Sequence, residues 1–227
     1  MAKVSLARKK ELNEPDELIN VSNQAAEFVR ENKEKVIGVI AAIVLIVVGI
    51  TGYQFYSSYY EKTAFVTFAK DIKWYQEDGE NVTPKSLEEV KERSEIFFKK
   101  YSGSVAGTLA KAKYAGIFYT EGDYNSAIEL YKKLLKELNG DSALKTMALS
   151  GLAYSYEAVK KFDDAIKTFE LITEEKTSVK KADALFHLGI LYELQGKKEK
   201  SREAFEKIIS YHTDSIYIEV AKEKIAG

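Results

Sequence analysis

The chain of 227 residues contains no cysteine, only two prolines and 13 glycines. Without cysteine it cannot form disulfides, a catalytic thiolate, a cysteine metal site or a lipidated N-terminal cysteine. Few segments alternate apolar and polar residues as strands do, while Ala, Leu, Glu, Lys and Tyr dominate. Because these residues favour helices, the sequence predicts an all-α protein.

An excess of one charge is also missing. The net charge is −1, and residues 1–35 hold seven bases and seven acids, so we expect no nucleic-acid partner. No Gly-rich phosphate loop or metal-ligand spacing occurs. His187 falls inside a helical segment and His212 in a turn next to Asp214, with no nucleophile beside either. We therefore expect no enzyme activity and no catalytic residue, cofactor, metal or small-molecule substrate.

One long apolar run stands out in a chain that is 30% charged. Residues 36–60 carry no charge, and from Val36 to Ile50 every residue is apolar or Gly, so the run has no polar face. As a helix, residues 36–56 would span about 31 Å, close to the hydrocarbon thickness of a bilayer. A signal peptide or a buried core helix fits less well, because a charged tail of 35 residues precedes the run and no A-x-A site follows. The sequence predicts a transmembrane helix at 36–56.

The flanks of this run bear on its orientation. Aromatic residues gather at one end, as in an interfacial belt, and bases close the other: Tyr53, Phe55, Tyr56, Tyr59 and Tyr60, against Arg30, Lys33 and Lys35. Three Lys or Arg residues lie within twenty residues of the run on each side, so this local count does not favour either orientation. The whole tail before the run, however, holds seven Lys or Arg residues. We expect a cytoplasmic N-terminus and a periplasmic or other extracytoplasmic C-terminal domain. A cytoplasmic domain on an inward-facing anchor is the alternative.

The tail ahead of the run, residues 1–35, is predicted to contain one short amphipathic helix. Pro15, Asp16 and Glu17 suit its first turn, and apolar residues follow at spacings of three and four: Leu18, Val21, Ala25 and Phe28. Such a helix could lie on the lipid headgroups or dock a membrane partner, and the residues do not separate these two alternatives.

Three segments after the run follow one template. They are "KAKYAGIFYTEGDYNSAIELYKKLL", "LSGLAYSYEAVKKFDDAIKTFELI" and "LFHLGILYELQGKKEKSREAFEKII". Small residues and aromatics recur at intervals of 38 and 36: Ala127, Ala165 and Ser201, and Tyr131, Phe169 and Phe205. We predict two helices in each unit, with turns at Gly122-Asp123, Lys160-Lys161 and Gly196. One hairpin cannot bury its apolar face alone, so the units are expected to stack, with the aromatics between them.

The flanking segments predict incomplete units. Ser104 and Ser215 suit N-caps, residues 83–100 suit the second helix of an earlier hairpin with Pro84 in its first turn, and residues 215–226 suit a capping helix. A helix at 59–76 would join the anchor to the stack. The expected division is 1–35 for the tail, 36–56 for the anchor, 57–103 for the connecting helix and first hairpin, and 104–227 for the repeats and cap.

The first helices of the units are expected to line a concave groove. Its predicted residues are apolar or aromatic, with acids at the edge: Leu109, Ala112, Gly116, Tyr119, Met147, Ser150, Tyr154, Glu157, Asp183, Phe186, Ile190, Glu193 and Leu194. None is Lys, Arg or Asn, so a carboxylate clamp is not expected. Such a surface suits helices or unfolded segments of other proteins. The alternative is that the cap helix or the first hairpin covers some of these residues.

These motifs resemble the tetratricopeptide repeat. The matching pattern is Leu188-Gly189-x-x-Tyr192, with the variants Leu152-Ala153-x-x-Tyr156 and Tyr114-Ala115-x-x-Phe118. The third unit departs from it at Lys198 and Ser201, and the proline that usually ends a repeat is absent. The resemblance implies an α-solenoid of three to four hairpins with a C-terminal capping helix.

A charged tail, one uncleaved span and a short repeat array also resemble the ancillary Sec translocon subunit family of bacterial inner membranes. That resemblance implies a single-pass protein whose periplasmic domain associates with the translocon and with periplasmic chaperones and receives exported polypeptides. The alternative is a scaffold for envelope-assembly or cell-division complexes that binds through its convex face.

Overall fold

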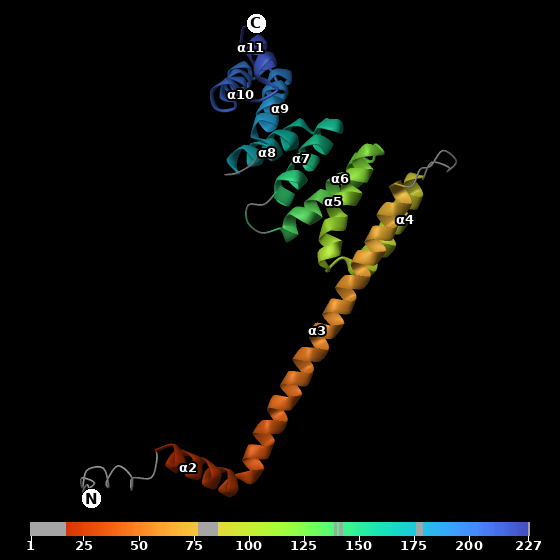
Figure 1. Ribbon diagram of the computed structural model, residues 1–227. Helices are drawn as coiled ribbons and strands as arrows, with labels where there is room; N and C mark the ends of the chain where they lie inside the picture. The colour runs from red at the N-terminus through yellow and green to blue at the C-terminus, as the bar shows by residue number, and fades with distance from the viewer. Residues whose placement is uncertain (1–16, 77–85, 139, 141–142, 176–178, 227) are drawn as a thin grey trace, which may run out of the picture. The chain divides into compact units, whose positions relative to one another are not determined.

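The computed structural model describes residues 17–76, 86–138, 140, 143–175 and 179–226. Within these ranges the chain forms ten helices and no strand, which confirms the predicted all-α class for the described residues (Figure 1). The chain divides into two compact units, Met1–Tyr59 and Tyr60–Gly227. The predicted roles of Pro15, Asp16 and Pro84 fall outside the described residues.

The N-terminal unit contains α2 (Glu17–Glu31) and the first part of α3 (Lys33–Gln76). Among the described helices, α3 is the one long and apolar enough to cross a membrane. The sequence predicted a separate helix at 59–76. Instead α3 runs unbroken to Gln76, because neither Gly nor Pro occurs between Tyr53 and Gln76 to interrupt it.

The C-terminal unit is a row of helical hairpins (Figure 1). Successive helices pack against one another, which matches the three predicted hairpins. Their bounds are α5 (Val105–Thr120) with α6 (Tyr124–Glu137), α7 (Ala143–Ala158) with α8 (Phe162–Glu174), and α9 (Lys181–Leu194) with α10 (Lys198–Tyr211). Before them lies α4 (Leu87–Tyr101), and after them α11 (Ile218–Ala226).

The three hairpin turns use one backbone geometry. Gly122, Lys160 and Gly196 all have positive φ, of 82°, 59° and 72°. In each turn the next residue donates its N–H to the carbonyl five positions earlier, at 2.8–2.9 Å. Lys160 therefore takes a left-handed conformation that normally favours glycine, and the predicted turn positions are confirmed.

Aromatic side chains fill the space between units, as predicted. Tyr131 of α6 is buried against α7, where a Cβ on Gly151 would lie 2.2 Å from its ring. Phe169 of α8 is fully buried and stacks on His187 of α9, with ring centroids 5.1 Å apart. The second helices α6 and α8 thus carry the aromatics that join their units to the next.

Helix starts follow local capping chemistry. Ser104 caps α5 as predicted, accepting a bond from the Gly107 N–H. The predicted helix at 83–100 begins instead at Leu87, because Ser86 and Glu89 form a reciprocal capping box there. The predicted cap helix begins at Ile218 rather than at Ser215, whose hydroxyl accepts the Tyr217 N–H at 3.2 Å in the preceding turn.

Candidate functional site

The last part of α3 forms a hairpin with α4 that packs on the repeats. Phe68 of α3 contacts Phe97 of α4 and Tyr114 of α5, with ring centroids 5.9 and 6.5 Å apart. Ala64 is fully buried in the same hydrophobic cluster. The sequence left open whether this first hairpin joins the stack, and these contacts show that it does.

A polar cluster fixes α3 against α4 and α5. The Asp71 carboxylate accepts bonds from Arg93 at 3.0 Å and from the Tyr114 hydroxyl at 3.1 Å. The Arg93 guanidinium also lies 4.0 Å from the centre of the Trp74 ring. Burial, and then the nearby charge of Asp71, raise the pKa of Tyr114, so the hydroxyl remains a donor. Residues from three helices therefore fix the position of α3 against α4 and α5.

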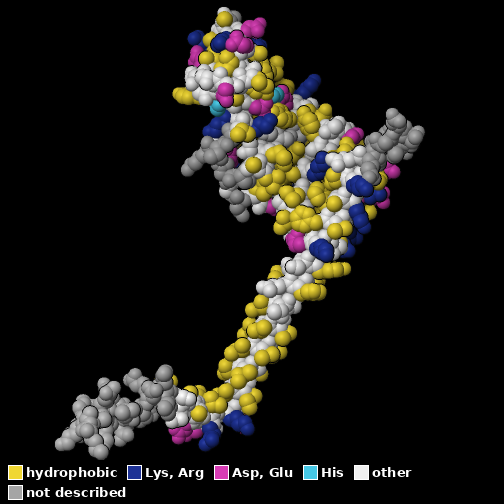
Figure 2. Space-filling view, in the orientation of Figure 1, with side chains coloured by type: hydrophobic (Ala, Val, Ile, Leu, Met, Phe, Trp, Pro, Cys, Tyr) yellow, Lys and Arg dark blue, Asp and Glu magenta, His cyan; other side chains and the backbone are white. Residues whose placement is uncertain are grey.

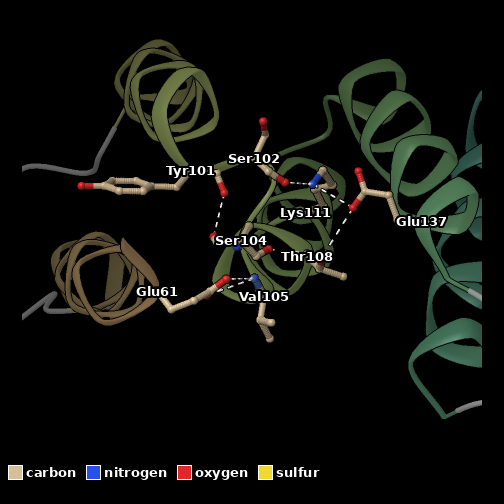
Figure 3. Close-up of polar contacts among 9 residues, drawn as sticks. Glu61, Tyr101, Ser102, Ser104, Val105, Thr108, Lys111 and Glu137 are labelled. Atoms are coloured by element: carbon tan, nitrogen blue, oxygen red, sulfur yellow. Dashed lines mark hydrogen bonds and ion pairs between the residues drawn. The ribbon is translucent and has the colours of Figure 1, made fainter. Parts of the chain in front are cut away.

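Figure 3 shows a second junction, where α3 meets the start of α5. Both carboxylate oxygens of Glu61 lie 3.1 Å from the Val105 backbone nitrogen, which donates to them. The Ser104 hydroxyl donates to the Tyr101 carbonyl at 2.7 Å and accepts from Gly107 at 2.8 Å. A carboxylate at a helix N-terminus is favoured by the helix dipole, so Glu61 secures α3 to α5.

The side chain of Lys111 ties α5 to α4 and α6 (Figure 3). Although it is only 4% exposed, its ammonium donates to the Ser102 carbonyl at 2.8 Å and to Glu137 at 2.9 Å. Close approach of α4 and α5 also requires Gly107, since a Cβ there would lie 2.2 Å from the Tyr101 carbonyl oxygen. Lys111 and Gly107 thus set the position of α5.

Between these helices lies a groove of about 1170 Å³, which we call the open groove. Its walls come from α3, α5 and the start of α7, and Tyr131 of α6 contributes to its lining. Phe65, Leu109 and Met147 are 41%, 38% and 47% exposed there. Figure 2 shows hydrophobic side chains gathered over α5 to α7 on the visible face of this unit. The lining residues are Phe65, Phe68, Ala69, Ile72, Lys73, Tyr75, Gln76, Leu109, Ala112, Lys113, Gly116, Ile117, Thr120, Tyr131, Leu144 and Met147.

The open groove contains part of the predicted surface. Of the predicted residues it brings together Leu109, Ala112, Gly116 and Met147. Tyr119 is exposed nearby, where its ring meets that of Tyr124 at 5.4 Å.

Two lysines also line the open groove, which the sequence analysis missed. Lys73 and Lys113 are exposed, and no Asp or Glu is among the described lining residues. The expectation that the groove lacks basic residues is therefore wrong for this half. The repeat alignment compared only the first helices of three units, so it left out the wall supplied by α3.

The other predicted residues lie in what we call the closed half, on α7 and α9. The hydroxyls of Tyr154 and Tyr217 donate to different oxygens of the Asp183 carboxylate, the second at 2.6 Å. The Tyr217 ring stacks on Phe186 with centroids 4.5 Å apart. The hydrogen bond to Asp183, aided by burial, raises the pKa of Tyr217 to about 12. These side chains are therefore used in contacts with one another.

Further contacts engage the remaining residues of the closed half. Glu157 lies 3.0 Å from His187 Nδ1, and Glu193 pairs with Lys224 of α11 at 2.8 Å. Ile190 packs against the hydrophobic cluster of α9, α10 and α11. Ser150 is buried and bonds its own helix, whereas Leu194 is 66% exposed. The alternative that the cap helix covers part of the predicted surface therefore applies to this half.

The histidines occupy structural positions. His187 lies among the rings of Phe169, Tyr154 and Phe186. His212 ends α10, donating its backbone N–H to the Ile208 carbonyl at 2.9 Å. Within the described ranges, no group of three or more metal-ligating side chains comes together.

Comparison with known proteins agrees with this geometry. The family model for the tetratricopeptide repeat-like domain matches residues 27–225. No curated protein sequence matches the chain. The matched range covers both α3 and the whole row of hairpins, and the three units show the shared turns and the aromatic packing described above. The chain belongs to the tetratricopeptide repeat-like domain family.

Proposed function

We propose that this protein is a membrane-anchored protein–protein interaction module that binds other polypeptides through the open groove. The observation that carries the proposal is an apolar groove of about 1170 Å³ walled by three helices of a repeat-like domain. Exposed apolar patches of this kind on stable domains are typically interaction sites. Domains of this family are generally protein-binding scaffolds, and we propose no enzyme activity.

The side chains of α3 support the membrane anchor. From Ile37 to Ile50, each Val, Ile and Leu is between 53% and 72% exposed, so this segment has no protein partner within the described structure. Exposing such a surface to water would be costly, at about 25 cal/mol for each Å². A bilayer removes that cost, and residues 36–56 have the length that a bilayer requires.

The anchor would act by raising local concentration. A groove held beside a membrane meets membrane partners, and chains that emerge from it, more often than a freely diffusing domain does. The seven bases of residues 1–35 support a cytoplasmic N-terminus and an exported groove. The resemblance to ancillary Sec translocon subunits supports the bacterial inner membrane as the location, and the translocon, periplasmic chaperones and exported chains as partners.

The groove can be tested by charge insertion. Leu109→Glu and Met147→Glu place a carboxylate on exposed apolar positions of the open groove, where the helices tolerate it. We expect both variants to lose co-purification of the partner from nanodisc-reconstituted membranes and to keep the wild-type helical signal in circular dichroism. Tyr154→Glu or Phe186→Glu would be poorer tests, because these residues hold the closed half together.

Lys132→Glu on the exposed face of α6 is the matched control. A photo-crosslinking residue at Leu109 should link the same partner that the control variant retains. Partner recovery that is unchanged in both groove variants would reject the open groove as the binding site.

A second experiment tests the anchor and its direction. The full chain should stay in the membrane pellet after alkaline extraction, and protease added to spheroplasts should digest the domain after Tyr60. Release by alkali would reject the anchor, and protection of the domain would place it in the cytoplasm.

A further inference from the structure

We infer that α2 is an interfacial helix, which lies along the membrane surface with its apolar face in the boundary between lipid headgroups and acyl chains. The partner of this face is therefore lipid and not another protein. The inference rests on the membrane anchor of the proposed function, because α3 must cross a bilayer for α2 to reach one. It is independent of the open groove.

One face of α2 is apolar and open. Its residues are Val21, Ala25, Phe28 and Val29, whose spacings of three and four place them on one side of the helix. Val21, Phe28 and Val29 are 65%, 62% and 47% exposed, and all described side chains of this helix are exposed. Because apolar surface is unfavourable in water, this face requires an apolar neighbour.

The chain connection keeps this face close to the bilayer. α2 ends at Glu31 and α3 begins at Lys33, so Asn32 alone separates the two helices. Val36, where the proposed span begins, follows Glu31 by five residues, and five residues of helix advance about 7.5 Å. The end of α2 is therefore held in the headgroup layer, where interfacial helices bury their apolar face about 5–10 Å deep.

The interruption at Asn32 allows α2 to lie along the surface. The Asn32 side-chain amide donates to the Phe28 carbonyl at 3.1 Å, and its oxygen accepts from the Lys35 ammonium at 3.5 Å. The amide thus satisfies a carbonyl at the end of α2 and contacts the first turn of α3. An unbroken helix would continue the axis of α3 away from the bilayer, whereas two helices joined at one residue can differ in direction.

The charges indicate that the apolar face is sufficient for this binding. Residues 17–35 hold four Glu and three Lys or Arg, so they carry no positive excess that would attract anionic lipids. A free peptide of this composition would bind a membrane weakly, but the adjacent span raises the local concentration of α2 at the surface. A protein partner would have to displace lipid that is already within reach. Zwitterionic lipid alone should therefore bind α2.

The absence of cysteine permits a clean test with single labels. Ala25→Cys and Asn23→Cys, on opposite faces of α2, are each labelled with an environment-sensitive fluorophore in the full chain, in phosphatidylcholine nanodiscs without other proteins. We expect the label at position 25 to emit at shorter wavelength, to be quenched by spin-labelled lipid and to be protected from iodide. The label at position 23 should show the reverse, and adding phosphatidylglycerol should change neither.

Two pairs of substitutions add the same charge to different faces. In the chain labelled at position 25, Val21→Glu combined with Phe28→Glu should abolish quenching by lipid and restore quenching by iodide. Asn23→Glu combined with Gln24→Glu, on the polar face, should leave both signals as they are in the wild type. Equal loss in the two pairs would contradict insertion through the apolar face.

The remaining outcomes separate the inference from the anchor. Equal iodide quenching at positions 23 and 25 would overturn the inference, as would protection that requires phosphatidylglycerol. Protection that appears only after membrane proteins are added would assign the face to a protein partner. A label introduced by Ile43→Cys reports on the span: if lipid quenches it but not the label at position 25, the inference fails and the anchor stands. If lipid quenches neither, the anchor of the proposed function fails as well.

Discussion

The open groove and the closed half are built from the same repeat and differ in what their exposed residues contact. In the open groove, Leu109 and Met147 line a cavity of about 1170 Å³ and are 38% and 47% exposed. In the closed half, Tyr154 and Phe186 are held by Asp183 and Tyr217. The comparison shows that repeat position alone does not make a binding surface, because neighbouring helices decide which positions remain accessible.

Deleting an aromatic ring should give the largest difference in unfolding free energy between a side chain buried between units and a side chain of the open groove. Phe169 is fully buried between units, so Phe169→Ala should lower the free energy of unfolding by about 3–5 kcal/mol. Phe65 is 41% exposed in the open groove, so Phe65→Ala should cost less than about 1 kcal/mol. Urea unfolding of the full chain, followed by the helical signal, measures both. Similar losses would mean that the groove is packed like a core.

Adding one methyl group should give a smaller difference in stability between a glycine packed against a buried ring and a glycine of the open groove. A Cβ at Gly189 would lie 2.5 Å from the buried ring of Phe205, so Gly189→Ala should destabilise by about 1–3 kcal/mol. At Gly116 the nearest atom would be the Tyr131 hydroxyl at 3.8 Å, so Gly116→Ala should stabilise by up to about 1 kcal/mol through helix propensity. Thermal unfolding of both variants shows whether each change stabilises or destabilises the protein. Destabilisation by Gly116→Ala would contradict the open space beside Gly116.

Raising the pH should weaken the contact between Tyr217 and Asp183 in the closed half. Tyr217 keeps its proton up to a pKa of about 12, whereas an unfolded tyrosine releases it near 10. Since the folded pKa is the higher one, its stabilisation is complete below pH 10 and is lost as the pH rises through 12. The stability advantage of the wild type over Tyr217→Phe should therefore shrink across this range in urea titrations. A constant difference would show that the proton is not held by Asp183.

The sequence predicted the elements that depend on local chemistry. The intervals of 38 and 36 residues located the hairpins, because each unit repeats the same small and aromatic residues where its helices meet. The turns at Gly122, Lys160 and Gly196 were predicted from the residue types that end helices, and the position of Ser104 was predicted from the residue types that cap helix N-termini.

The site was predicted only in part, because it depends on contacts between distant segments. The repeat alignment placed Leu109 and Met147 correctly on one surface, but α3 lies outside the aligned units, so Lys73 was not foreseen. Nor could periodicity show that Tyr217 reaches back 31 positions to stack on Phe186. The buried position of Lys111 likewise follows from its carbonyl and carboxylate partners, which no local pattern reveals.

The shared carboxylate of Asp183 has a consequence for how the domain opens. A solenoid normally frays from its end one unit at a time, since each unit touches only its neighbours. Here Tyr154 of the second unit and Tyr217 beside the last helix hold the same side chain of the third. Amide protons of α7, α9 and α11 should accordingly exchange with solvent as one cooperative block, so that the terminal helix is protected for as long as the middle of the array.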